Sequence, residues 1–221
     1  MRHSTNGSGT FTAPETHHPL LSFSGKFISV VFHPLFIPLL VTAYLLYVHP
    51  MLFTGLDSKE KIRVLASVFV NLTLLPAMTV FLLWRLKFAD NIFLRTQKER
   101  IIPFAAVMFF AFWCWNVFRN LNAPELFVDF LLGTFIAVII GWIANIYYKI
   151  SLHALGVGGM AWFITRVAMH SDSDSGLFIA IAVLIAGLVC TSRLIVSDHK
   201  PGDIYTGLIF GAGSQWLAGV L

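Results

Sequence analysis

The chain has 221 residues, of which 57% are hydrophobic and 12% are charged, and its mean hydropathy is +0.78. This composition is typical of an integral membrane protein and excludes a soluble domain with a large core. The net charge is +4 with histidine neutral, but the sequence has no basic stripe or nucleic-acid-binding motif, so nucleic acid is not an expected partner. The sequence also contains none of the spacings typical of metal ligands, so we expect no metal site and no cofactor.

The chain begins with a polar segment and continues as a series of apolar segments. Residues 1–26 are rich in Ser, Thr, Gly and His and are predicted to form a flexible tail before one membrane domain, 27–221. A helix that crosses a bilayer needs about 20 mostly apolar residues. This rule predicts an all-α, polytopic membrane bundle of six or seven transmembrane helices, six if the first or third segment is re-entrant. The expected spans are 27–48, 62–84, 101–118, 126–148, 153–169, 177–196 and 204–221.

Several residues inside these spans are interpreted as structural. The glycines of the fifth and seventh spans favour close helix–helix packing. Arg119 and Arg166 are expected at the opposite face from the site described below, as snorkelling side chains or interhelical pairs. His33 and His49 are also interpreted as structural residues.

The segment 191–203, which joins the last two spans, is the most informative part of the chain. Ionisable residues at the edge of a membrane are costly, so a cluster of them indicates a functional site. His199 and Asp203 are four residues apart, which on a helix brings their side chains within reach. A carboxylate beside an imidazole fixes its tautomer and supports a positive charge on it. Arg193 adds a planar guanidinium suited to two phosphate oxygens, so the segment predicts an activated histidine that faces an oxyanion.

Counting membrane crossings places two more polar clusters on the same side as segment 191–203. Two crossings back lies His153, and two further crossings back lies the basic loop 95–100. Three clusters that are separated in the sequence are therefore expected at one membrane face, which supports a single site.

The residues of segment 191–203 resemble the type 2 phosphatidic acid phosphatase superfamily of membrane lipid phosphatases. A motif of that family, Ser-Arg-x5-His-x3-Asp, is complete here as Ser192, Arg193, His199 and Asp203. It is the most specific part of the resemblance, which extends over about residues 95–210.

Two other motifs of this family are present only in part. The motif Pro-Ser-Gly-His corresponds to residues 150–153, where Ser151 and His153 are kept but Ile replaces Pro and Leu replaces Gly. The motif Lys-x6-Arg-Pro is degenerate: Lys98 and Arg100 precede Pro103, but neither the spacing nor the Arg-Pro pair is kept.

The resemblance implies an acid-phosphatase-like helical core and a metal-independent phosphoric ester hydrolase that works through phosphohistidine. His199 would be the nucleophile, Asp203 would orient it, and His153 would be the general acid. A second histidine is required because the leaving oxygen lies on the opposite side of phosphorus from the nucleophile. The phosphate oxygens would be held by Arg193, Ser192, Ser151, Arg100 and Lys98.

The expected substrate is a lipid whose phosphate reaches the membrane interface. Phosphatidic acid, phosphatidylglycerol phosphate and polyprenyl diphosphate all meet this condition, and the sequence does not choose among them. The expected location is a bacterial inner (cell) membrane, with the bilayer and the lipid phosphate as partners; the sequence leaves the membrane face and the oligomeric state open.

Three other functions are compatible with the sequence. The first is a non-hydrolytic lipid-phosphate binder or transporter with the same cationic pocket, which the altered motifs favour. The second is a vanadate-dependent oxidation enzyme, because haloperoxidases share the histidine constellation; those relatives are soluble. The third is a purely structural membrane protein.

Overall fold

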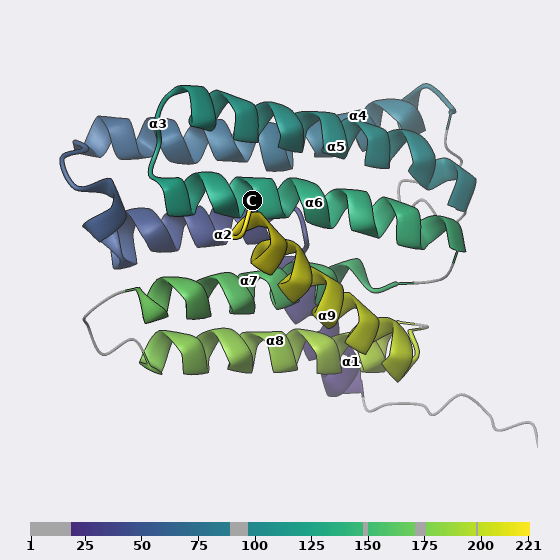
Figure 1. The fold of residues 1–221 in the computed structure, drawn as a ribbon. Helices are drawn as coiled ribbons and strands as arrows, with labels where there is room; N and C mark the ends of the chain where they lie inside the picture. The colour runs from purple at the N-terminus through teal and green to yellow at the C-terminus, as the bar shows by residue number, and fades with distance from the viewer. Residues whose placement is uncertain (1–18, 89–96, 148–149, 171–175, 198) are drawn as a thin grey trace, which may run out of the picture.

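A computed structural model describes residues 19–88, 97–147, 150–170, 176–197 and 199–221 of the chain. Every regular element in these ranges is a helix (Figure 1). Five helical segments are long and apolar enough to cross a membrane, which confirms the prediction of an all-α, membrane-embedded protein with several spans. These segments are Ser58–Arg85, Ile101–Asn120, Glu125–Tyr147, Leu152–Met169 and Gly176–Val196.

The predicted tail is shorter than expected, because helix α1 (Pro19–Val31) begins inside it. Residues 1–18 lie outside the described residues, but 19–26 are helical. Pro19 is well suited to the first turn of α1, because N–H groups in that turn have no acceptor within the helix and proline lacks an N–H. Gly25 lets α1 pack against α8, since an added Cβ there would lie 2.7 Å from Cγ1 of Val196. Packing against α8 therefore accounts for the helix at residues 19–26, where the local sequence gives little indication of one.

The first predicted span, 27–48, is not one continuous helix. Helix α1 ends at Val31, and α2 (Ile37–Ala43) begins after a break and continues as the π-helix η1 (Tyr44–Val48). Pro34 explains the break, because proline has no N–H to donate and disfavours helical geometry at the residue before it, His33. A short 3₁₀-helix, η2 (Pro50–Phe53), follows.

The second span contains a change of helix type beside a proline. Helix α3 (Ser58–Phe69) passes into the π-helix η3 (Val70–Leu74) and then into α4 (Leu75–Arg85). Local π-helical turns commonly accommodate a proline such as Pro76, whose ring displaces the regular hydrogen bonding. The helix starts at a capping box in which Asp57 Oδ1 accepts from the Glu60 N–H at 2.7 Å.

The remaining helices run up and down with short connections. They are α5 (Gln97–Asn120), α6 (Glu125–Tyr147), α7 (Leu152–Met169), α8 (Gly176–Val196) and α9 (Pro201–Ala218). Helix α7 is the most buried of the spans and packs against α6, α8 and α9. Helix α9 crosses α7 and α6 obliquely, and it is not among the five segments that are long and apolar enough to span (Figure 1).

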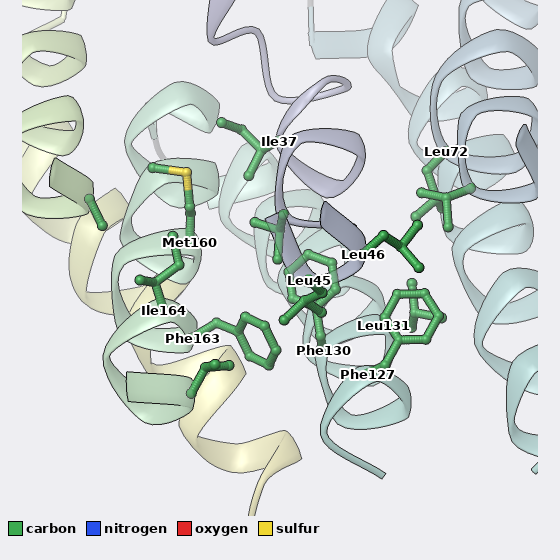
Figure 2. Close-up of a cluster of buried hydrophobic side chains, with 14 of the residues drawn as sticks. Ile37, Leu45, Leu46, Leu72, Phe127, Phe130, Leu131, Met160, Phe163 and Ile164 are labelled. Carbon is green, nitrogen blue, oxygen red and sulfur yellow. The ribbon is translucent and has the colours of Figure 1, made fainter. Parts of the chain in front are cut away.

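A cluster of large apolar side chains holds α6 and α7 against α2 and η1 (Figure 2). Phe130 of α6 and Phe163 of α7 are both almost fully buried, and their ring centroids lie 4.7 Å apart. Leu45 and Leu46 of η1 fill the space beside them with no exposed surface. This core fixes the position of the N-terminal helices, including the break at His33, relative to α7.

Glycines bring the backbones of α7 and α9 into direct contact, as their abundance in these segments predicted. An added Cβ at Gly207 would lie 2.7 Å from the carbonyl oxygen of Ser151, and one at Gly211 would overlap the carbonyl oxygen of Leu155. Such close approach is the usual role of small residues between membrane helices. It sets the distance between the starts of α7 and α9.

The two arginines predicted to be structural have partners at the other end of the helices. Arg166, near the end of α7, donates to Asp129 Oδ2 of α6 at 2.8 Å. The guanidinium of Arg119, near the end of α5, lies 5.2 Å from the ring centroid of Trp115. Both contacts stabilise the bundle away from the polar cluster that forms the candidate site.

Candidate functional site

The starts of α5, α7 and α9 and the end of α8 lie at one end of the bundle, so the three polar clusters share one side as the crossing count predicted (Figure 1). A cavity of about 620 Å³ opens among these helices and α2, α4 and α6. Its lining is mainly apolar, but it includes a polar group that we call the polar end: His33, His153, Arg193, Ser197 and His199.

His199 and Asp203 meet at the start of α9, although not in the way the sequence predicted. The expectation was two residues on one helix face, but His199 precedes the helix and Asp203 is in its first turn. The Asp203 carboxylate accepts a hydrogen bond from the Lys200 N–H at 2.9 Å, and the same oxygen lies 3.4 Å from His199 Nδ1. Asp203 therefore both caps α9 and faces the imidazole, which is the arrangement that orients a nucleophilic histidine.

The start of α7 is connected directly to the start of α9. The Ser151 N–H donates to the Asp203 carbonyl oxygen at 3.2 Å, and Ser151 Oγ accepts from the Ala154 N–H at 3.4 Å as the cap of α7. His153 follows in the first helical turn, with its ring half-buried in the cavity lining. The two histidines predicted to do the chemistry therefore line the same cavity, which confirms that they lie together.

Ser29 of α1 contacts three of the predicted site residues. Its hydroxyl accepts from Arg193 Nη1 at 3.3 Å and lies 3.1 Å from Ser192 Oγ, which donates to the Val189 carbonyl oxygen. Its backbone carbonyl lies 3.0 Å from His153 Nε2. Because a carbonyl oxygen only accepts, His153 carries its proton on Nε2 in this contact. Ser29 thus occupies groups that phosphate oxygens would otherwise contact.

His33 also belongs to the site, although sequence reasoning interpreted it as structural. Its ring makes an edge contact with the ring of His153, with centroids 5.3 Å apart. It lies in the connection between α1 and α2, outside the five candidate spans, and burial together with the positive charge of Arg193 lowers its pKa below 6.5. The signal that points to it is Pro34, because a proline inside an apolar segment predicts a break in the helix at the residue before it.

Arg193 is the cation of the cavity lining within the described residues. Its Nη1 is bound to Ser29, while its Nε is buried and has no hydrogen-bond partner among the described residues. Buried donors in proteins are nearly always hydrogen-bonded, so this Nε can donate to an acceptor on a ligand that enters the cavity. The Ser197 hydroxyl donates to the Arg193 carbonyl oxygen and closes the last turn of α8 around it.

The other predicted phosphate-binding residues have different positions. Ser151 and Ser192 are almost fully buried and are not part of the cavity lining; their hydroxyls serve a helix cap and the contact with Ser29. Lys98 and Arg100 lie in the first turn of α5, and their side chains fall outside the described part of the structure. Leu152, which stands where the family motif has glycine, packs close to Gly141 of α6 as well as lining the cavity.

Groups of three or more histidine, cysteine, aspartate or glutamate side chains able to hold a metal ion are absent from the described residues. Comparison of the chain with protein-family models, with curated proteins and with solved structures gave no match. The geometry of the site and the motif residues themselves are therefore the basis for assigning a function.

Proposed function

We propose that this protein is an integral membrane lipid phosphatase of the type 2 phosphatidic acid phosphatase kind. The observation that carries the proposal is the buried Nε of Arg193, which has no hydrogen-bond partner among the described residues and lies beside three histidines in a mainly apolar cavity. Among the described residues, the cavity lining has this cation and no carboxylate, which favours an anionic ligand, and its apolar part favours a ligand with a hydrocarbon part. A lipid phosphate has both.

The reaction proceeds by two in-line displacements at phosphorus. His199 attacks through a ring nitrogen, a P–N bond forms, and the P–O bond to the lipid breaks as His153 donates a proton to the leaving oxygen. Water then attacks phosphorus, its proton passes to His153, the P–N bond breaks and phosphate leaves. Asp203 supports the positive charge on His199, and Arg193 stabilises the charge on the equatorial oxygens. This chemistry is metal-independent.

The substrate phosphate competes with Ser29 for Arg193 and His153. Its oxygens replace the Ser29 hydroxyl on Arg193 Nη1 and supply an acceptor to the unpartnered Nε, so that the guanidinium binds in the two-point manner that phosphate prefers. The bound state therefore requires a local shift of α1 or of the two side chains.

The wider assignment follows from the same resemblance. We propose an acid-phosphatase-like core of six or seven membrane helices, in which α9 and the segment Ile37–Val48 add to the five candidate spans. We place the protein in a bacterial inner membrane, acting on phosphatidic acid, phosphatidylglycerol phosphate or polyprenyl diphosphate.

The deciding experiment is phosphate release by detergent-purified protein, in the presence of EDTA, from each of these three lipids. Turnover is expected to survive EDTA and to vanish in His199→Ala, since no other group takes the nucleophile's place. His170→Ala is the matched control, because His170 lies at the far end of α7 and its side chain is exposed. Full turnover by folded His199→Ala would contradict the proposal.

A non-hydrolytic lipid-phosphate binder or transporter remains a second candidate, favoured by the occupation of the site by Ser29. A binder or transporter differs from a phosphatase in one result. Lipid phosphate would bind to the protein, and this binding would require Arg193, but no phosphate would be released over many hours.

A further inference from the structure

The cavity continues beyond its polar end into a region that the phosphate chemistry does not use. We call this region the apolar chamber; it is lined by Val80, Phe104, Val107, Ala111, Ala137 and Val138. These side chains come from α4, α5 and α6, whereas most of the polar end comes from α7, α8 and the segment before α9. The cavity therefore has walls from α4, α5 and α6 in addition to the elements that carry the polar end.

The chamber follows single faces of two antiparallel helices. Phe104, Val107 and Ala111 are three and four residues apart on α5 and so lie along one face. Seven residues of α-helix rise about 10 Å, so this face is long enough to line an extended hydrocarbon segment. Ala137 and Val138 contribute the facing wall from α6.

The size of the cavity is that of a ligand site. Protein interiors are packed with few voids larger than a water molecule, whereas ligand pockets range over about 300–1,000 Å³. A cavity of about 620 Å³ lies in that range, large enough for a phosphate group and one chain.

We infer that the apolar chamber binds one hydrocarbon chain of the lipid substrate between α4, α5 and α6 while its phosphate lies against Arg193. The identity of the head group rests on the proposed function; the chain site rests on the cavity alone. Because the chain leaves a bilayer that is as apolar as the chamber, little free energy is gained from its transfer. The chamber therefore selects chains by shape. A larger side chain in its lining is expected to exclude long-chain substrates and to leave the binding of short-chain substrates unchanged.

The first test locates the chain directly and does not require turnover. Purified full-length protein in detergent is irradiated with a long-chain alkyl phosphate that carries a diazirine at the chain end, and the labelled residues are mapped by mass spectrometry. Labelling is expected on Val107, Ala111, Ala137 and Val138, and excess unlabelled alkyl phosphate should displace it. Displaceable labelling confined to the outward residues Phe109, Trp113 and Ile143, which are half exposed, would overturn the inference.

The second test narrows the chamber and compares two substrates. Ala137→Phe is expected to lower kcat/KM for a long-chain phosphate by roughly tenfold or more relative to a short-chain phosphate, as misfit in an apolar pocket usually does. Ala180→Phe is the matched control, since Ala180 is exposed on α8 and lies outside the cavity lining. Val107→Phe makes the same test from α5 if Ala137→Phe does not fold.

The two proposals fail in different ways. Equal effects of Ala137→Phe on both substrates in folded protein would overturn the chain site and leave the phosphatase intact. If the wild type releases no phosphate from any substrate, but chamber labelling occurs and Ala137→Phe abolishes it, the phosphatase fails and the chain site stands.

Discussion

At the scale of single residues, Arg193 organises the polar end of the cavity. Its Nη1 is held by Ser29, its carbonyl oxygen accepts from Ser197, and its Nε points to no partner among the described residues. Guanidinium is weakly hydrated and planar, so it tolerates this half-buried position and still presents two donors to one phosphate.

Replacing Arg193 with lysine tests this two-point binding. Lysine keeps the positive charge but loses the paired N–H donors of the planar guanidinium. Because a hydrogen bond to a charged group contributes about 1.5–3 kcal/mol, kcat/KM should fall roughly 10- to 100-fold. Inhibition by inorganic phosphate should weaken in parallel. Arg119→Lys, at the opposite end of α5 over Trp115, should change neither quantity; an Arg193→Lys variant with wild-type kinetics would show that Arg193 does not bind phosphate by its fork.

His33 makes the stability of the fold depend on pH. Its pKa in the folded chain lies below 6.5, because burial and Arg193 disfavour the imidazolium. As pH falls below 6.5 the unfolded chain takes up a proton that the folded chain does not, so stability is fully present above 6.5 and is lost toward the folded pKa. His33→Gln should therefore show a smaller drop in unfolding temperature between about pH 7.5 and pH 5 than the wild type. His170→Gln serves as the control, because His170 is exposed. An equal drop in unfolding temperature in the wild type, His33→Gln and His170→Gln would show that His33 does not cause the pH dependence.

At the scale of helices, the contact between α7 and α9 carries the geometry of the site. The Ser151 N–H donates to the Asp203 carbonyl oxygen, and Gly207 and Gly211, about one and two turns further along α9, keep the helices at that distance. The break between α1 and α2 has a second role, because it lets Ser29 of α1 and His33 of the connection itself contact His153.

Gly211→Ala should force α7 and α9 apart. The added Cβ would overlap the Leu155 carbonyl oxygen and lie 2.8 Å from the Gly159 nitrogen, and such overpacking typically costs about 1–3 kcal/mol. We expect a lower midpoint in denaturant unfolding and a loss of activity, since Asp203 and His199 would move away from His153. Gly213→Ala is the matched control because no atom outside its own helix lies within 4 Å of the new Cβ; if both variants unfold alike, the helix contact is not tight.

At the scale of the whole molecule, helices α2 and α4 to α9 all line one cavity. Helices α7 and α8 and the segment before α9 carry most of the polar end, and α4, α5 and α6 carry the apolar chamber. A head group and a chain can therefore be bound by different parts of one bundle, which suits a substrate that is itself divided in this way.

The arrangement of spans predicts which loops share a side of the membrane. Five crossings separate Lys59 from Lys200 and three separate Asn120 from Lys200, so the first two residues should lie opposite the third. Single cysteines at these positions, in a chain with the free Cys114 and Cys190 replaced by serine, should label from opposite sides of sealed vesicles with a membrane-impermeant reagent. Labelling of Asn120→Cys and Lys200→Cys from the same side would rule out this topology.

The sequence by itself determined the class of the protein and the core of its candidate site. Hydropathy is a sum over neighbouring residues, so the membrane helices from 62 to 196 could be predicted to within a few residues. The pairing of His199 with Asp203 is local, and the packing glycines follow from composition; only the capped geometry at the start of α9 differs from the expectation. The tertiary structure alone decided that 19–26 are helical, that the first segment breaks at Pro34, and that Ser29 and His33 enter the site. Ser29 lies 163 residues from Ser192 and 124 from His153, and no periodicity along the chain reports a contact that two distant helices create by packing together.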